Sequence, residues 1–103
     1  MKITTDNYEA EVLQSEKPVL LDFWADWCGP CKNFAPILEA YEAENGDKIK
    51  LGKVNVDEET SLAQQFRVMG IPTIVLMIDG EKKASSTGVL SKADLEKFID
   101  SNL

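Results

Sequence analysis

The sequence predicts an α/β fold in which helices cover both faces of a mixed β-sheet. Apolar runs typical of buried strands alternate with segments whose apolar residues recur at helical spacing, which indicates two successive β-α-β units. An Asp-Gly dipeptide between two later strand-like runs indicates a β-hairpin, and an amphipathic C-terminal segment supplies a covering helix. With 103 residues, the chain has the size of one compact domain, residues 1–103.

The N-terminal segment predicts a short edge strand followed by a helix. Residues 2–4 are the candidate strand. Asp6 and Glu9 have the spacing of a capping box, which marks a helix start. We expect this helix to end before Pro18, because proline removes a backbone donor and clashes with the preceding turn.

Residues 18–25 are nearly all apolar, as in a strand buried within a parallel sheet. The one polar interruption is Asp22, which by the two-residue alternation of strands shares a face with Leu20 and Trp24. Burial disfavours the charged form of a carboxyl group, so we expect the pKa of Asp22 to be raised. Asp22 is therefore either a hydrogen-bonded structural residue or a proton acceptor for a nearby thiol.

The only cysteines, Cys28 and Cys31, lie three residues apart where this strand gives way to a helix. Residues at this spacing meet across one helical turn, so the two sulfurs can reach disulfide distance. The first cysteine falls at the helix N-terminus, where free N–H groups and the helix dipole favour a thiolate. We therefore expect Cys28 to be the nucleophile and Cys31 the resolving thiol of a redox site. Gly29 leaves space beside the sulfur, and Pro30 suits a first helical turn.

Two helices and a strand follow the dithiol. Residues 31–45 form the long second helix, with Pro36 inside its apolar pattern. Residues 49–56 form the next strand and residues 57–66 the third helix. Lys53 interrupts that strand, and a lone lysine there is most often an edge residue or one that extends its charge to solvent.

The C-terminal part predicts a hairpin and a final helix. Residues 74–78 and the run from residue 81 onward are its strands. Gly88, within the second run, indicates a close backbone approach. Ser91 and Asp94 again have capping-box spacing, and the helix they begin completes the fold.

Composition excludes several classes of function. The net charge is −7 and the pI about 4.5, whereas nucleic-acid and anionic-membrane binding need clustered Lys and Arg. No apolar run is long enough to span a membrane, and the N-terminus lacks the apolar core of a signal peptide, so we expect a cytoplasmic protein. In that reducing compartment, two close cysteines favour redox catalysis over a structural disulfide. Two cysteines without histidine do not complete a four-ligand zinc site, except across a dimer with help from carboxylates, so no metal is expected.

The run Phe23-Trp24-Ala25-Asp26-Trp27-Cys28-Gly29-Pro30-Cys31-Lys32 resembles the active-site signature of the thioredoxin family. The resemblance continues through Lys53-Val54-Asn55-Val56-Asp57, Gly70-Ile71-Pro72-Thr73, Asp79-Gly80 and Gly88. It implies a thioredoxin fold, with a central mixed five-stranded sheet flanked by four helices. The implied strand order is 2–4, 49–56, 18–25, 74–78 and the strand from residue 81.

The resemblance also implies an activity, that of a general protein-disulfide reductase. Cys28 and Cys31 alternate between dithiol and disulfide through a mixed disulfide with a client protein. Asp22 then becomes the proton acceptor for Cys31, and Lys53 tunes the proton affinity of Asp22. No cofactor is expected to be bound, since NADPH and FAD serve the implied partner, thioredoxin reductase. We expect the protein to act as a monomer.

Substrate binding is implied for an apolar rim around the sulfurs. On frequency alone the Ile71–Pro72 bond is predicted to be trans. The resemblance implies instead a cis bond facing the dithiol, which leaves the backbone of Ile71 free to pair with an extended peptide. The rim residues are Trp27, Gly29, Pro30, Ile71, Pro72, Gly88 and Val89.

Other interpretations remain open at this point. A thiol oxidase or disulfide isomerase uses the same fold, although the Gly-Pro pair between the cysteines is associated with reductants in this family. Glutaredoxin-like proteins, which use glutathione, carry a different pair of residues between their cysteines. A scaffold that needs no turnover is a third possibility. Lys32 either stabilises negative charge at the site or is an exposed helical lysine, and Trp24 either packs beneath the active-site turn or simply fills the core.

Overall fold

The computed structural model describes all residues, 1–103. Its four strands form one mixed sheet in the order β2-β1-β3-β4, in which β1 runs parallel to β2 and antiparallel to β3. The predicted α/β class is confirmed. In chain order, the elements are η1 (Glu9–Leu13), β1 (Val19–Trp24), α1 (Gly29–Asn45), β2 (Lys50–Asn55), α2 (Thr60–Gln65), β3 (Thr73–Ile78), β4 (Glu81–Thr87) and α3 (Lys92–Asp100). None of the helices is sufficiently long and apolar to cross a membrane.

The expected fifth strand, residues 2–4, is reduced to a single bridge. Lys2 pairs with Lys53 in parallel, at the free edge of β2 where the strand was expected. Two backbone hydrogen bonds of 2.8 Å hold it there, from Ile3 N to Lys53 O and from Lys53 N to Met1 O. The buried Ile3 side chain anchors this short segment, but the pairing does not extend far enough to make a strand.

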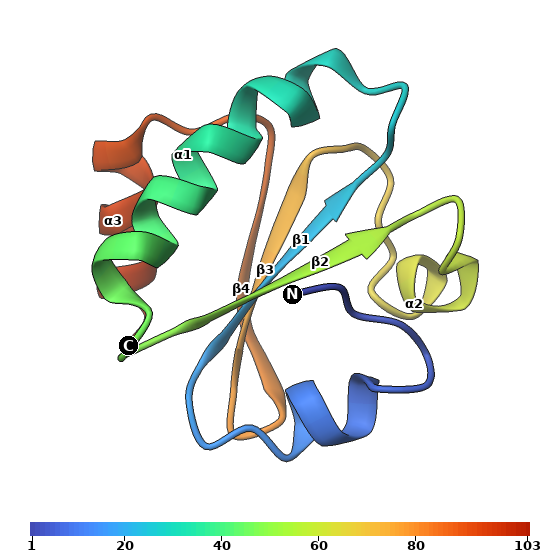
Figure 1. Ribbon diagram of the computed structural model, residues 1–103, viewed down its shortest axis with the longest axis horizontal. Helices are drawn as coiled ribbons and strands as arrows, with labels where there is room; N and C mark the ends of the chain where they lie inside the picture. The colour runs from blue at the N-terminus through green and yellow to red at the C-terminus, as the bar shows by residue number, and fades with distance from the viewer.

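The sheet separates two layers of helices. Figure 1 shows α1 and α3 together on one side of the sheet and α2 with the N-terminal helix η1 on the other. Alternating residues of β1 supply both interfaces: Leu20 packs with Phe34 and Leu38 of α1, whereas Leu21 packs with Val12 and Leu62. The two-residue period of a strand therefore places Asp22, which alternates with Leu21, on the α1 side.

The first helix starts later than the capping pattern predicts, and Asp6 does not cap it. Its N-cap is Tyr8, which makes no side-chain capping bond. The backbone N–H of Asp6 is instead 3.2 Å from the Thr4 hydroxyl, while the Asn7 side chain accepts from Thr4 N at 2.7 Å. Asp6 is thus held in a turn before the helix, and the capping-box prediction is wrong here.

The third helix is also shorter than predicted. Residues 57–66 were expected to be helical, but α2 begins only at Thr60. The Asn55 side-chain oxygen accepts hydrogen bonds from the backbone of Asp57 at 2.9 Å and of Glu58 at 3.3 Å. These bonds form a turn at the end of β2 that competes with the helical conformation.

The hairpin and the final helix follow their predicted signals. Asp79 and Gly80 have φ of 53° and 78°, the left-handed pair that a two-residue turn between β3 and β4 requires. The Ser91 hydroxyl accepts from Asp94 N at 3.1 Å and caps α3. Gly88 was predicted to lie within the second strand of the hairpin, but it follows Thr87, the last residue of β4.

Candidate active site

Cys28 and Cys31 form a disulfide at the point where β1 leads into α1. Their Cα atoms are 5.3 Å apart, within the range that a disulfide requires. Cys28 is the N-cap residue of α1, with Pro30 in the first turn, and its sulfur accepts a hydrogen bond from Cys31 N at 3.2 Å. This N–H and the helix dipole both favour negative charge on Cys28 Sγ when the disulfide is reduced.

The loop before β3 lies against the disulfide. Cys28 Sγ is 3.8 Å from the carbonyl oxygen of Ile71, and the Ile71–Pro72 peptide bond is cis. The trans bond expected from frequency alone is therefore wrong, and the geometry implied by the resemblance is present. Gly88 N donates to Pro72 O at 2.8 Å, so these two predicted rim residues are brought together from distant parts of the chain. Both cysteines are only 4% exposed, which leaves a narrow approach to the sulfurs.

An apolar pocket of about 320 Å³ adjoins this loop, and we call it the Trp27 pocket. Of the predicted rim residues, only Trp27 and Ile71 line it. Trp27 is 70% exposed, and its indole N–H donates to Asp57 Oδ2 at 2.9 Å, which fixes the ring at the pocket edge. The remaining lining residues are Val56, Ala63, Val68, Met69 and Gly70.

Two residues at this site were missed in the sequence. Asp57 was expected only as the first residue of the third helix, but it orients Trp27. Met69 is 98% exposed, and its place directly before Gly70-Ile71-Pro72 was the available signal. By contrast, Gly29, Pro30, Gly88 and Val89 lie outside the Trp27 pocket, and Lys32 is exposed and forms no ion pair.

Asp22 is buried on the α1 side of β1, with 2% of its surface exposed. Lys53 is its register partner on β2, and Lys53 Nζ lies 3.6 Å from Asp22 Oδ2, too far for a direct hydrogen bond. Asp22 Oδ1 has no hydrogen-bond partner. Loss of hydration raises the pKa of Asp22 to about 6, and the positive charge of Lys53 offsets only part of that effect.

Trp24 connects this ion pair to the disulfide. Lys53 Nζ lies 5.2 Å from the centre of the Trp24 ring, within the range of a cation–π contact. The same tryptophan packs against a buried cluster made of Ala25 and the two cysteines. Trp24 thus packs beneath the active-site turn, and Asp22, Lys53 and the disulfide belong to one continuous region.

Comparisons with known proteins agree with this geometry. The thioredoxin family model matches residues 1–101. The chain is 48% identical to thioredoxin from Acidithiobacillus ferridurans over 101 residues, which cover 98% of this chain and 94% of that protein. It is 44% identical to thioredoxin from Bacillus subtilis over 103 residues, covering 100% and 97% of the two chains.

The chain belongs to the thioredoxin family. Its Cys28–Cys31 disulfide occupies the family's active-site position, so the protein is a protein-disulfide oxidoreductase that works by dithiol–disulfide exchange. No cluster of three or more His, Cys, Asp or Glu side chains is arranged to hold a metal ion.

Proposed function

We propose that this thioredoxin-family protein is a general protein-disulfide reductase of the cytoplasm, acting as a single-domain monomer. The hydrogen bond from Cys31 N to Cys28 Sγ at the start of α1 is the observation that carries the proposal. It stabilises the Cys28 thiolate of the reduced protein, which is the attacking form in thiol–disulfide exchange.

In the first step, the Cys28 thiolate attacks one sulfur of a client disulfide. A new S–S bond joins Cys28 to the client, and the second client sulfur leaves as a thiolate. The extended client segment lies along the Ile71 backbone and the Trp27 pocket. The 3.8 Å approach of Cys28 Sγ to the Ile71 carbonyl supports this placement, because a chain paired with Ile71 passes directly beside the reacting sulfur.

In the second step, Cys31 loses its proton and attacks Cys28 Sγ. The client leaves with its second thiolate, so two electrons have passed to it and Cys28–Cys31 is again a disulfide. Asp22 is the proposed proton acceptor for Cys31, tuned by Lys53. A pKa of about 6 supports that role, because such a carboxyl group is largely ionised at neutral pH yet more basic than an ordinary aspartate.

Turnover requires a reductant, and we assign this to thioredoxin reductase, which would supply electrons from NADPH through FAD. The chain's own chemistry needs no bound cofactor. The net charge of −7 disfavours nucleic acid and anionic membranes as partners, which leaves disulfide-containing proteins as clients.

The decisive experiment is a redox titration with dithiothreitol, followed by the fluorescence of Trp24 and Trp27. We expect one two-electron transition near the cytosolic glutathione poise or below it, about −220 to −320 mV. Cys28→Ser is the control and should show no transition. Cys31→Ser should trap a mixed disulfide with a model client, because only the first step remains possible.

The other outcomes separate the alternatives. A potential of about −120 to −180 mV indicates an oxidase or isomerase, because such values belong to strongly oxidising members of the fold. A wild-type protein with no transition excludes both activities and leaves a scaffold.

A further inference from the structure

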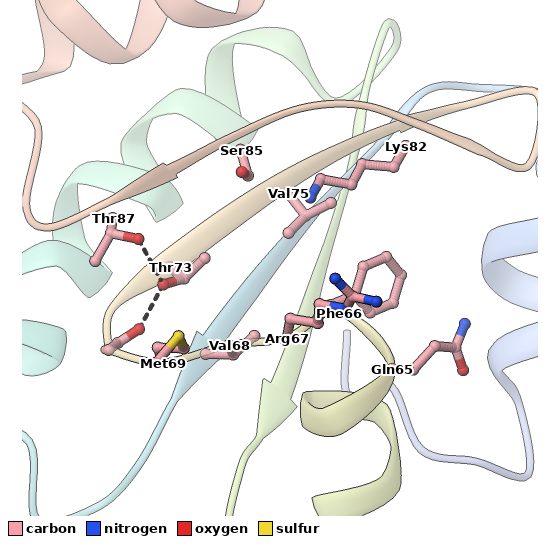
Figure 2. Close-up of a pocket in the computed structure, with 11 residues that line it drawn as sticks. Gln65, Phe66, Arg67, Val68, Met69, Thr73, Val75, Lys82, Ser85 and Thr87 are labelled. Carbon is pink, nitrogen blue, oxygen red and sulfur yellow. Dashed lines mark hydrogen bonds between the residues drawn. The ribbon is translucent and has the colours of Figure 1, made fainter.

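A second pocket, of about 810 Å³, lies on the η1 side of the sheet over β3 and β4. Figure 2 shows its walls, which are the loop after α2 and the facing side chains of the two strands. Thr73 and Thr87 are register partners here, and their hydroxyl oxygens are 3.1 Å apart. We call it the Arg67–Lys82 pocket after its two charged residues.

The charge of this pocket is opposite to that of the whole protein. Arg67 and Lys82 are the only charged residues that line it, in a chain whose net charge is −7. Neither forms an ion pair, whereas four of the chain's other lysines do. In Figure 2 the Lys82 side chain reaches from β4 toward Val75, and Arg67 lies on the loop of the facing wall. Two cations without partners therefore face one cavity.

This pocket adjoins the Trp27 pocket. Both are lined by Val68, Met69 and Gly70, so one short stretch of loop forms their common wall. Thr73 holds that wall in place, because its hydroxyl donates to the Gly70 carbonyl. The Arg67–Lys82 pocket therefore neighbours the surface along Ile71 on which the proposed client segment lies.

We propose that the Arg67–Lys82 pocket binds acidic side chains of client proteins and so selects clients that carry Asp or Glu near the reducible cysteine. The proposal rests on the proposed reductase function and names a substrate preference of that same site. Arg67 suits a carboxylate because its guanidinium group can donate two parallel hydrogen bonds. The hydroxyl of Ser85 adds a donor on the opposite wall.

Electrostatics explains why an acidic client segment fits this pocket better than a basic or neutral segment does. The protein as a whole repels acidic partners, so a local pair of cations is needed to admit them. Charge pairs near a surface change association rates and partner choice more than they change intrinsic reactivity. We expect the preference to weaken as salt rises, since exposed charges are screened.

The test compares peptides that share one disulfide and differ only beside the cysteine. One version carries two glutamates before the cysteine, one carries them after it, and one has glutamines instead. The second-order rate constant for reduction by the reduced protein is measured by stopped-flow fluorescence at low salt. We expect at least one glutamate peptide to react faster than the glutamine peptide, by about 1.5- to 5-fold for each cation engaged.

Substitutions in the pocket test whether Arg67 and Lys82 cause the preference for glutamate peptides. Arg67→Gln and Lys82→Gln should each lower the glutamate-to-glutamine rate ratio, and the double variant should bring it to about one. Lys83→Gln is the matched control, because Lys83 is the exposed neighbour of Lys82 but does not line the pocket. All variants should reduce the glutamine peptide at the wild-type rate.

Each other outcome overturns the proposal in an identifiable way. An unchanged ratio in the double variant excludes the pocket as its source. An equal loss in Lys83→Gln shows an effect of net charge alone. Failure to reduce any peptide contradicts the proposed function itself, which is a separate result.

Discussion

The substitution Asp22→Asn should stabilise the oxidised protein at neutral pH. The pKa of Asp22 is raised from 3.8 to about 6 by burial, so the folded state binds this proton more tightly than the unfolded state does. The folded state is therefore favoured below pH 3.8, and that advantage is lost as the pH rises through 6. At ~1.36 kcal/mol per pKa unit, raising the pKa from 3.8 to about 6 corresponds to about 3 kcal/mol.

Asparagine has nearly the same shape and does not ionise, so the variant avoids this cost. We expect its free energy of unfolding to exceed that of the wild type by about 3 kcal/mol at pH 8 and by little at pH 3.5. Guanidinium denaturation of both oxidised proteins across this pH range measures the difference. Asp26→Asn, at an exposed aspartate, is the matched control and should show no comparable rise.

The reasoning is refuted if the difference between Asp22→Asn and the wild type does not change with pH. A constant difference would mean that packing or the contact with Lys53 sets the effect, not the ionisation of a buried carboxyl group. A stability advantage of Asp22→Asn that appears only at low pH would mean that folding lowers the pKa of Asp22 instead of raising it.

Three further substitutions test the packing and backbone. Phe34→Ala should cost about 3–5 kcal/mol in denaturant unfolding, because this α1 side chain is fully buried against the sheet, and a loss below 1 kcal/mol would contradict that burial. Ser91→Ala should cost about 1 kcal/mol by removing the cap of α3, and an unchanged melting temperature would show that the bond to Asp94 N contributes nothing. Gly88→Ala should cost about 1 kcal/mol or more, because the φ of Gly88 is 101°. Gly29→Ala is the control and should have little effect, because an added Cβ meets no atom within 4 Å at either glycine. Equal melting temperatures for the two variants would argue against backbone strain at Gly88.

Features encoded by adjacent residues were predictable. The spacing of Cys28 and Cys31 and the apolar run before them were enough to predict a thiol at a helix N-terminus, because helix geometry is local. The Asp79-Gly80 turn is equally local, since only residues that tolerate positive φ suit it. Where two local signals competed, prediction failed: Asp6 matched a capping box, but Thr4 and Asn7 formed a turn ahead of it.

The sequence by itself therefore determined the fold class, the redox pair and the buried position of Asp22. Tertiary structure decided which distant residues meet: Lys53 with Asp22, Ile71 with Cys28, and Arg67 with Lys82 around one pocket. The register of β1 against β2 brings Lys53 to Asp22, and the loop that packs on the disulfide brings Ile71 to Cys28. The physical reason is that burial and charge pairing depend on neighbours across the sheet, and no periodicity within one segment specifies them.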